Sequence, residues 1–410
     1  MINKFRDFWQ RQSRNYKVFL ARGLLDTMFA GSGVNEYWNI FITRLGATSV
    51  ELGIINSISH AIMALLALPS GWLTDHSTKM KKLYLYGRGL QIPTPLLRFL
   101  AQSWPVCLVI DIWQAIAQRL TGPPSQIIWI SSLKDSDRVR GISFHRVIIS
   151  IAGVIAPLIS AYIVTYFGGL DSADNIRPLF LLQFFISIVT FLLISTQMRE
   201  VSFAREANKQ GVYGYFYSVL DNVPGLKLLL LRQCVMTLVS HMRMPFSGIY
   251  MVDVKGASAF ILGWRGTVST LIGVLFSMAA GQLADRYGRR KLAYISRVFW
   301  WASILVTIFT PLDHPEYLIL AGLLQGIQTA LFIGWTAFIH EYIPLEVRGR
   351  WNGISMLTHG IIGTVSPILG GLIWNINPDY IWWINLIGDV FFVLPLMIMI
   401  PDRDCEITRD

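Results

Sequence analysis

Ionisable side chains lie inside several long apolar runs of the sequence, and three of them share the run 18–42. Arg22 and Asp26 are four residues apart, a spacing that lets them pair along one helix face. Glu36 has no cation near it in the same run. Burial in apolar surroundings favours the neutral form of a carboxyl group, which suits a proton carrier. We therefore expect Asp26 or Glu36 to carry a proton. The alternative is a structural Arg22–Asp26 pair, with Glu36 reaching water at the helix end.

Arginines in two of the runs could bind an anion. Arg232 and Arg243 share one stripe of the run 226–250, and Arg22 occupies the place equivalent to Arg232 in an internal repeat. Paired arginines across a cavity hold phosphate or carboxylate groups well. Both Arg22 and Arg232 lie near the ends of their runs, however, so long side chains that reach the surface are the alternative.

Polar side chains recur at helical spacing in three further runs, and together they could line the path of a solute. They are Asp111, Gln114 and Gln118 in 105–131, Gln325 and Gln328 in 315–341, and His359 in 352–375. Histidines such as His60 and His359 can titrate near neutral pH. A lone histidine in a helix more often makes only a packing hydrogen bond, and this alternative stays open.

The composition identifies the kind of protein that must hold these residues. Of 410 residues, 53% are hydrophobic and only 15% are charged, and the mean hydropathy is +0.48. Soluble domains carry about 25% charged residues. A bilayer-spanning helix needs about 20 apolar residues, and the long runs are unbroken rather than alternating. We therefore expect an all-α membrane protein, and a soluble, disordered or disulfide-based fold is excluded.

Twelve apolar runs predict twelve transmembrane helices. They are 18–42, 50–73, 83–103, 105–131, 143–167, 178–197, 226–250, 258–281, 292–311, 315–341, 352–375 and 380–400. We expect a cytoplasmic tail (1–17), a six-helix bundle (18–197), a cytoplasmic connector (198–225), a second six-helix bundle (226–401) and a second tail (402–410). The first tail is too charged for the core of a signal peptide. The three scattered cysteines indicate neither a metal site nor a disulfide framework.

The two halves repeat at an offset of 210 residues. The equivalent pairs are Gly71 and Gly281, Asp75 and Asp285, Gly153 and Gly363, Pro157 and Pro367, and Arg22 and Arg232. A constant offset over several elements indicates a duplication. It predicts two bundles related by a pseudo-twofold axis along the membrane normal.

The cations predict the orientation in the membrane. With the first tail inside, the cytoplasmic segments hold 22 of the 35 Lys and Arg residues, and the external loops hold three: Arg44, Arg177 and Lys255. Because cytoplasmic loops carry the excess of Lys and Arg, both termini are expected in the cytoplasm of a cell-membrane protein. The formal charge of +10 then reflects orientation and contact with anionic lipid rather than nucleic-acid binding.

The loop after the run 258–281 carries a motif. Residues 281–291 read GQLADRYGRRK, and residues 71–82 hold a degenerate copy, GWLTDHSTKMKK. The first resembles the loop motif of the major facilitator superfamily. The resemblance implies two six-helix bundles, transport by alternating access and a loop that latches one facing state. The residues it assigns to this gating loop are Gly71, Asp75, Gly281, Asp285, Arg286, Gly288, Arg289 and Arg290. The alternative is a basic anchor alone.

A second pattern joins Gly and Pro within the runs 143–167 and 352–375. It reads GVIAP at 153–157 and GTVSPILGG at 363–371, and it resembles an element of antiporter-type members of the same family. Small residues with proline allow close helix packing and a kink. Gly153, Pro157, Gly363 and Pro367 are therefore expected to pack at a moving interface, and the resemblance favours export.

These features together predict a secondary transporter that exports a small organic solute in exchange for protons, acting as a monomer without a cofactor. No cluster of catalytic groups and no Walker-type phosphate loop indicates an enzyme or an ATP-driven pump. Two alternatives stay open. One is a carrier of organic anions or phosphorylated metabolites, suggested by Arg22 and Arg232, and the other is a membrane sensor that transports nothing.

Overall fold

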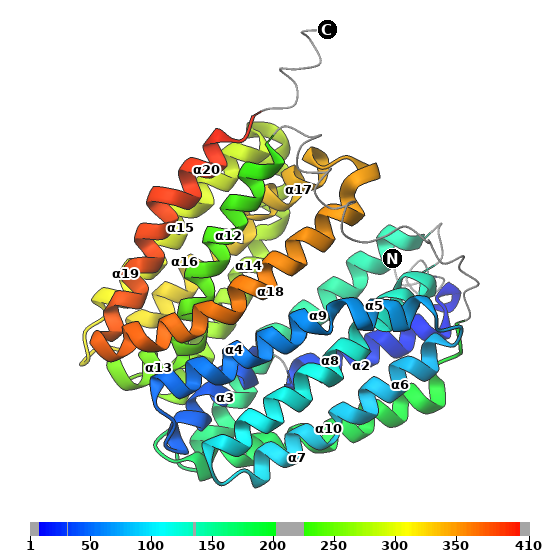
Figure 1. Cartoon of the computed structure of the whole chain (residues 1–410), viewed down its shortest axis with the longest axis horizontal. Coiled ribbons are helices and arrows are strands. Elements are labelled where there is room, and N and C mark those ends of the chain that lie inside the picture. The colour runs from blue at the N-terminus through cyan, green and yellow to red at the C-terminus, as the bar shows by residue number, and fades with distance from the viewer. Residues whose placement is uncertain (1–7, 31, 134–136, 202–224, 402–410) are drawn as a thin grey trace, which may run out of the picture. The chain divides into compact units, whose positions relative to one another are not determined.

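The computed structural model describes residues 8–30, 32–133, 137–201 and 225–401, and every regular element within them is helical (Figure 1). The chain is the all-α membrane protein that the sequence predicts, with six helical spans in each half. Residues 1–7 of the first expected tail, all of the second tail and residues 202–224 of the expected connector lie outside the described residues.

Within the described residues, nine helices with defined bounds build the first half. They are α2 (Arg14–Ala30), α3 (Ser32–Arg44), α4 (Ser49–Leu65), α5 (Ala67–Asp75), α6 (Met80–Gln91), α7 (Pro93–Leu100), α8 (Trp104–Ser132), α9 (Arg138–Tyr166) and α10 (Ala173–Gln197). The runs 18–42, 50–73 and 83–103 are each divided into two helices. Proline accounts for two of the divisions, because it cannot donate the backbone hydrogen bond of a helix interior. Pro69 lies in the first turn of α5, and Pro93 begins α7.

The described part of the second half, residues 225–401, has twelve elements. They are α12 (Leu226–Arg243), η2 (Met244–Phe246), α13 (Ser247–Ile249), η3 (Tyr250–Val254), α14 (Ala259–Tyr287), α15 (Arg289–Phe309), α16 (Tyr317–Leu331), α17 (Ile333–Tyr342), α18 (Leu345–Ile376), α19 (Pro378–Gly388), η4 (Asp389–Val393) and α20 (Leu394–Met399). A 3₁₀ turn at Pro245 interrupts the run 226–250, and two π-helical segments, η3 and η4, widen the runs that contain them.

Eight stretches of described helix are individually long and apolar enough to cross a membrane. They are 49–75, 140–166, 173–197, 259–287, 289–309, 317–342, 350–376 and 378–399. The other four runs, 18–42, 83–103, 105–131 and 226–250, are shorter or more polar. They hold many of the buried charges described below.

The chain forms two compact units, residues 1–45 with 65–208 and residues 46–64 with 209–410. Most of α4 therefore belongs to the second unit. It packs tightly there on α18: a Cβ atom at Gly53 would lie 2.5 Å from the carbonyl oxygen of Pro367, and one at Gly371 would lie 2.5 Å from that of Ser49. Because these distances are too short for any side chain, glycine is required for the two backbones to approach.

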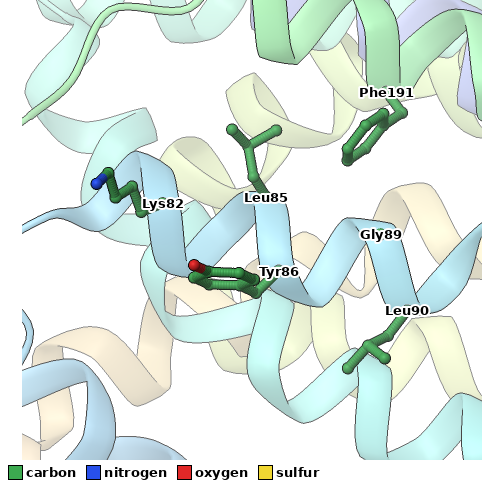
Figure 2. A pocket seen from close by; sticks show the side chains of 6 residues that line it. All are labelled: Lys82, Leu85, Tyr86, Gly89, Leu90 and Phe191. Carbon is green, nitrogen blue, oxygen red and sulfur yellow. The ribbon is translucent and has the colours of Figure 1, made fainter.

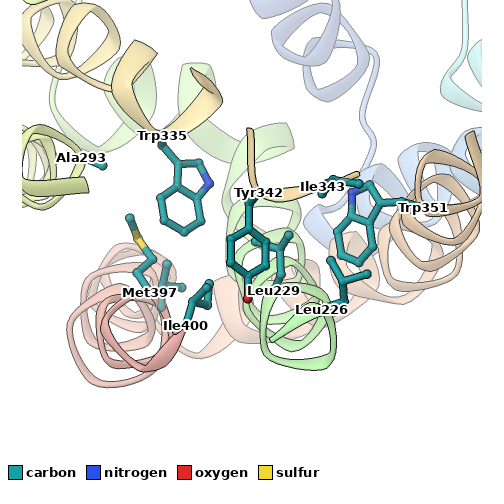
Figure 3. Packing of buried hydrophobic residues seen from close by; sticks show 10 residues of the cluster. Leu226, Leu229, Ala293, Trp335, Tyr342, Ile343, Trp351, Met397 and Ile400 are labelled. Carbon is teal, nitrogen blue, oxygen red and sulfur yellow. The ribbon is translucent and has the colours of Figure 1, made fainter. Parts of the chain in front are cut away.

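Each unit has an apolar core. In the first unit Phe19, Tyr84 and Ile128 bring α2, α6 and α8 together. In the second, Trp335, Tyr342 and Trp351 pack with the ends of α12 and α20 (Figure 3). Large apolar side chains also cover the outside, as Met278, which is 79% exposed, illustrates. Such a surface suits lipid rather than water.

Candidate functional site

A charged network joins three helices of the first unit. Arg22 of α2 donates from Nε to Asp26 Oδ2 at 2.8 Å. Arg88 of α6 places Nη2 3.4 Å from the same oxygen and also donates to Thr190 Oγ1 of α10 at 2.9 Å. The Arg22 guanidinium lies 5.6 Å from the centre of the Tyr84 ring. Asp26 is thus a carboxylate shared by two arginines, an arrangement that crosslinks α2, α6 and α10.

A second network occupies the equivalent helices of the second unit. Arg297 of α15 lies 3.1 Å from Asp389 of η4, and each side chain is only 1% exposed. Trp301 donates from Nε1 to the other Asp389 oxygen at 2.6 Å. Arg232 of α12 is also buried, and its guanidinium lies 4.4 Å from the centre of the Trp335 ring. These residues join the seventh, ninth and twelfth predicted helices, as the first network joins the first, third and sixth.

The two networks differ in the position of their acid. Asp26 lies one turn after Arg22, whereas the residue 210 positions later is Met236. The second unit takes its acid from Asp389, so Arg232 has no carboxylate of its own beside it. Among the described residues, its Nε and Nη2 atoms are buried without a hydrogen-bond acceptor. A buried guanidinium in this state has unused capacity to bind an anion.

Asp111 of α8 lies in a third ionic group. It accepts hydrogen bonds from Trp38 Nε1 at 3.0 Å and from Arg98 Nη2 at 3.5 Å, and Arg98 also stacks 4.2 Å from the Trp38 ring centre. Gln114 is half-buried, and within the described chain its Oε1 atom has no donor. Gln118 is exposed.

The remaining polar residues expected along a solute path are spread over both units. Gln325 of α16 accepts a hydrogen bond from Arg265 of α14 at 2.7 Å, and Gln328 is half-buried. Arg243 lies between two rings, 5.0 Å from Trp300 and 4.8 Å from Trp382. Glu36 is half-buried on α3.

His359 has partners that the sequence pattern does not reveal. Its ring centre lies 4.7 Å from that of His241 on α12, and His241 lies 4.6 Å from His60 on α4. His60 is recognisable in sequence only as a lone helical histidine, and His241 gives no signal at all. No spacing rule links three residues that come from three different helices.

The loop between α14 and α15 is tied to neighbouring helices of its unit. Arg289 lies 3.7 Å from Asp285 and also forms an ion pair with Glu341 at the end of α17. Arg290 donates to the carbonyl oxygens of Met397 at 3.1 Å and Ile400 at 2.7 Å. Basic side chains thus hold this loop against the ends of α17 and α20.

The glycines of the two loop copies differ in their roles. Gly288 has a φ of +95°, a backbone conformation that favours glycine, and it makes the turn from α14 to α15. A Cβ atom at Gly71 or Gly281 would meet no described atom within 4 Å. Asp75, Asp285 and Arg286 are exposed. Among the described residues, no packed neighbour therefore requires a glycine at position 71 or 281.

The Gly-Pro elements lie inside α9 and α18. Gly153 is half-buried and Pro157 is buried in α9. In α18 a Cβ atom at Gly363 would lie 3.0 Å from His241 Nδ1, and one at Gly370 would lie 2.3 Å from the carbonyl oxygen of Met242. Gly363 and Gly370 thus face α12, while Pro367 faces Gly53 of α4.

A surface hollow of about 580 Å³ lies between α6 and α10 (Figure 2). It is lined by Lys82, Leu85, Tyr86, Gly89, Leu90 and Phe191. None of the expected site residues is among them, and the lining is almost entirely apolar. In the part of the chain that the structure describes, no three His, Cys, Asp or Glu side chains are placed to hold one metal ion.

Comparison with known proteins places this architecture among transporters. The profile of the Major Facilitator Superfamily matches residues 18–212 and 229–404. MFS transporter L2 of Phoma sp. is 25% identical over 138 residues, which span 33% of this chain and 23% of that protein. The multi-drug resistance efflux pump PmrA of Streptococcus pneumoniae is 30% identical over 134 residues, 32% of this chain and 33% of the pump. The chain thus matches only a third or less of these two relatives' lengths.

Two solved structures share the fold over nearly the whole chain. The nucleoside transporter NupG aligns with a TM-score of 0.72 at 15% identity, covering 95% of this chain and 100% of that one. A bacterial homologue of the iron transporter ferroportin, in an inward-facing state, aligns with a TM-score of 0.69 at 15% identity, covering 94% and 98%. At such identities the likeness concerns the fold alone. With a family profile that matches both halves and a fold shared along the chain, this protein belongs to the Major Facilitator Superfamily.

Proposed function

We propose that the protein is a secondary transporter that exports a small organic solute across the cell membrane in exchange for protons, by alternating access. In this proposal residues 18–197 and 226–401 act as the two bundles, and the segments 1–17, 198–225 and 402–410 lie in the cytoplasm. The basic cytoplasmic segments contact anionic lipid, and the protein works as a monomer.

The packing of the α18 glycines is the observation that carries this proposal. Gly370 faces α12 and Gly371 faces α4 at distances that exclude a Cβ atom, and at Gly363, which also faces α12, a Cβ atom would be tightly crowded. A helix with bare backbone on two sides can shift against both neighbours without losing interlocked side chains. Pro367 in the same segment removes one helical hydrogen bond and permits bending. This is the behaviour that the antiporter-type Gly-Pro element implies.

One relative supports export. The similarity to the multi-drug resistance efflux pump PmrA covers a third of each chain and reaches 30% identity. This similarity favours outward movement of an organic solute rather than uptake of a nutrient.

Proteoliposomes with an imposed pH gradient test the proposal. Purified protein is reconstituted, and the movement of ethidium, a cationic dye, is followed with and without the gradient. We expect gradient-dependent ethidium transport that stops when a protonophore collapses the gradient. The same vesicles are tested with radiolabelled benzoate and glucose 6-phosphate. Transport that ignores the pH gradient would contradict proton coupling, and no flux of any probe would favour the membrane sensor.

Arg232 favours a second candidate function, transport of organic anions. Its guanidinium is 6% exposed, and two of its nitrogens lack acceptors among the described residues. Arg297 belongs to the same network, and among the described residues its Nε and Nη2 atoms also lack a hydrogen-bond acceptor. Two arginines with one carboxylate, Asp389, leave an excess of buried positive charge. Benzoate or glucose 6-phosphate flux without ethidium flux would establish this second function instead.

A further inference from the structure

Three of the seven histidines meet at one place in the second unit, and neither the charged networks nor the loop motif involves them. His60 comes from α4, His241 from α12 and His359 from α18. The ring of His241 is the middle one, with centre distances of 4.6 Å to His60 and 4.7 Å to His359. In Figure 1, α12 (green) and α18 (orange) run side by side in this unit.

The surrounding residues hold the rings in place and leave one nitrogen available. His241 is 9% exposed, and within the described chain its Nδ1 atom has no hydrogen-bond partner. Thr237, one turn before His241 on α12, places Oγ1 3.2 Å from Nδ1 of His359. Gly363 lies against both His241 and His60, and a Cβ atom there would sit 3.0 Å from His241 Nδ1 and 3.3 Å from His60 Cγ. The absence of a side chain at Gly363 therefore makes the room that the rings occupy.

The charged groups of the neighbouring helices are occupied elsewhere or lie far along the helix. On α12, Arg243 packs on Trp300 and Trp382, and Arg232 precedes His241 by nine residues, about 13 Å along a helix. On α4, Glu51 accepts hydrogen bonds from Thr48 at the start of the helix.

The same holds for the two other packed helices. In α18 the arginines Arg348 and Arg350 lie in the first two turns. They precede His359 by nine or more residues. On the run of α19 and η4, Asp379 is bonded to Tyr250, and Asp389 is bonded to Arg297. The groups that face each imidazole are therefore chiefly the two other imidazoles.

We propose that His60, His241 and His359 form the proton-binding site of the transporter. One imidazole of the cluster accepts a single proton on a ring nitrogen with a free lone pair, and the two adjoining rings stay neutral. A second proton is disfavoured because two imidazolium ions would stand less than 5 Å apart, a like-charge contact in apolar surroundings. The three groups then bind protons as one coupled unit. Since the rings come from three helices, any shift of α4, α12 or α18 changes their contacts and the affinity for the proton.

The three intramembrane acids that pair with arginine are weaker candidates for this role. Asp26 is shared by Arg22 and Arg88, Asp111 contacts Arg98, and Asp389 contacts Arg297. A carboxylate in such a pair cannot take up a proton without leaving a buried arginine unpaired, which is costly. Imidazole also changes its charge between pH 5 and 8, where a cellular proton gradient operates.

A direct titration tests the site without any substrate, so it can succeed even if the proposed export fails. The full chain with ¹³C-labelled histidine rings is placed in nanodiscs, and ring resonances are followed by NMR from pH 5 to 8. The variants His60→Gln, His241→Gln and His359→Gln each lose one ring resonance, which assigns that resonance to the substituted histidine. In the wild type we expect these three resonances to shift over the same pH range. In His241→Gln the two survivors should lose their coupling to the middle ring, and their titration midpoints should differ from the wild-type values. The exposed His340→Gln serves as the matched control and should leave the three unchanged.

Two results overturn the site. Independent titration of the three histidines in the wild type would show that they do not share a proton, and an absence of titration across the range would show that they bind none. The transport readout, which rests on the proposed function, separates coupling from folding. His241→Gln should lose ethidium movement driven by the pH gradient and keep ethidium counterflow, as should His359→Gln. Retention of gradient-driven transport in both variants would also contradict the proposal.

Discussion

At the scale of single residues, three buried carboxylates are held by specific partners rather than left isolated. Asp26, Asp111 and Asp389 each contact an arginine, and two of them also accept a hydrogen bond from a tryptophan. The i, i+4 spacing predicts the Arg22–Asp26 pair, since both lie on one helix. The Arg297–Asp389 pair spans 92 residues. Sequence spacing cannot predict such a pair, because the pairing depends on how α15 and η4 pack.

The Arg297–Asp389 pair should be essential to the stability of the second unit. Asp389→Asn leaves a guanidinium that is 1% exposed without its counter-ion. Breaking a buried pair on one side costs about 3–5 kcal/mol. We therefore expect a clear fall in the thermal unfolding temperature of the purified protein. The double variant Arg297→Met with Asp389→Leu should recover much of the loss, and an unchanged unfolding temperature in the single variant would contradict this account.

Asp26 should behave as a structural residue rather than a proton carrier. Asp26→Asn removes the charge shared by Arg22 and Arg88, so both pH-driven transport and counterflow should fall together with thermal stability. The two modes are measured in the same proteoliposomes. Loss of the pH-driven mode alone, with normal counterflow and stability, would instead assign the coupled proton to Asp26.

At the scale of elements, glycine decides how closely the helices approach. The sequence predicts the twelve runs and the Gly-Pro element of α18. It does not predict the division of three runs in the first half, nor the grouping of most of α4 with the second unit. Hydropathy shows the length of an apolar segment. A break in a helix depends instead on single backbone hydrogen bonds, and the choice of neighbouring helices depends on side-chain packing. His241 shows the same limit, because its importance comes only from two other helices.

Gly363→Ala should disturb the histidine cluster. The added methyl group would press on His241 and His60, so we expect reduced transport and altered histidine resonances. Gly122→Ala in α8 is the matched control, since a Cβ atom there meets no atom within 4 Å. Exchange of glycine for alanine within a helix stabilises it by up to about 1 kcal/mol where space allows. Equal transport and equal histidine spectra in the two variants would show that the missing side chain at Gly363 is not needed to accommodate the imidazole rings.

The loop between α14 and α15 should control the rate of transport rather than folding. Asp285 is 75% exposed and contacts Arg289 at 3.7 Å, a distance at which a surface pair adds little stability. We expect Asp285→Asn to keep wild-type expression and thermal stability while slowing transport in vesicles. Normal transport by this variant would show that the loop is only a basic anchor at the membrane surface and does not control the transport rate.

At the scale of the whole molecule, the chain combines a family fold with an interior rich in arginine. The repeat and the distribution of cations predict two six-helix bundles from sequence alone, because both signals accumulate over hundreds of residues. The solute is not predictable in this way. It depends on which side chains line the transport path, and helix faces in the sequence do not show this.

The central claim is that solute and protons move in opposite directions through one protein. Its most direct test is to load proteoliposomes with ethidium and a fluorescent pH indicator at equal pH on both sides, and to let ethidium leave down its own gradient. The account predicts protein-dependent acidification of the vesicle interior in step with ethidium loss, weakened in His241→Gln and intact in His340→Gln. Ethidium loss with no accompanying proton movement would contradict it.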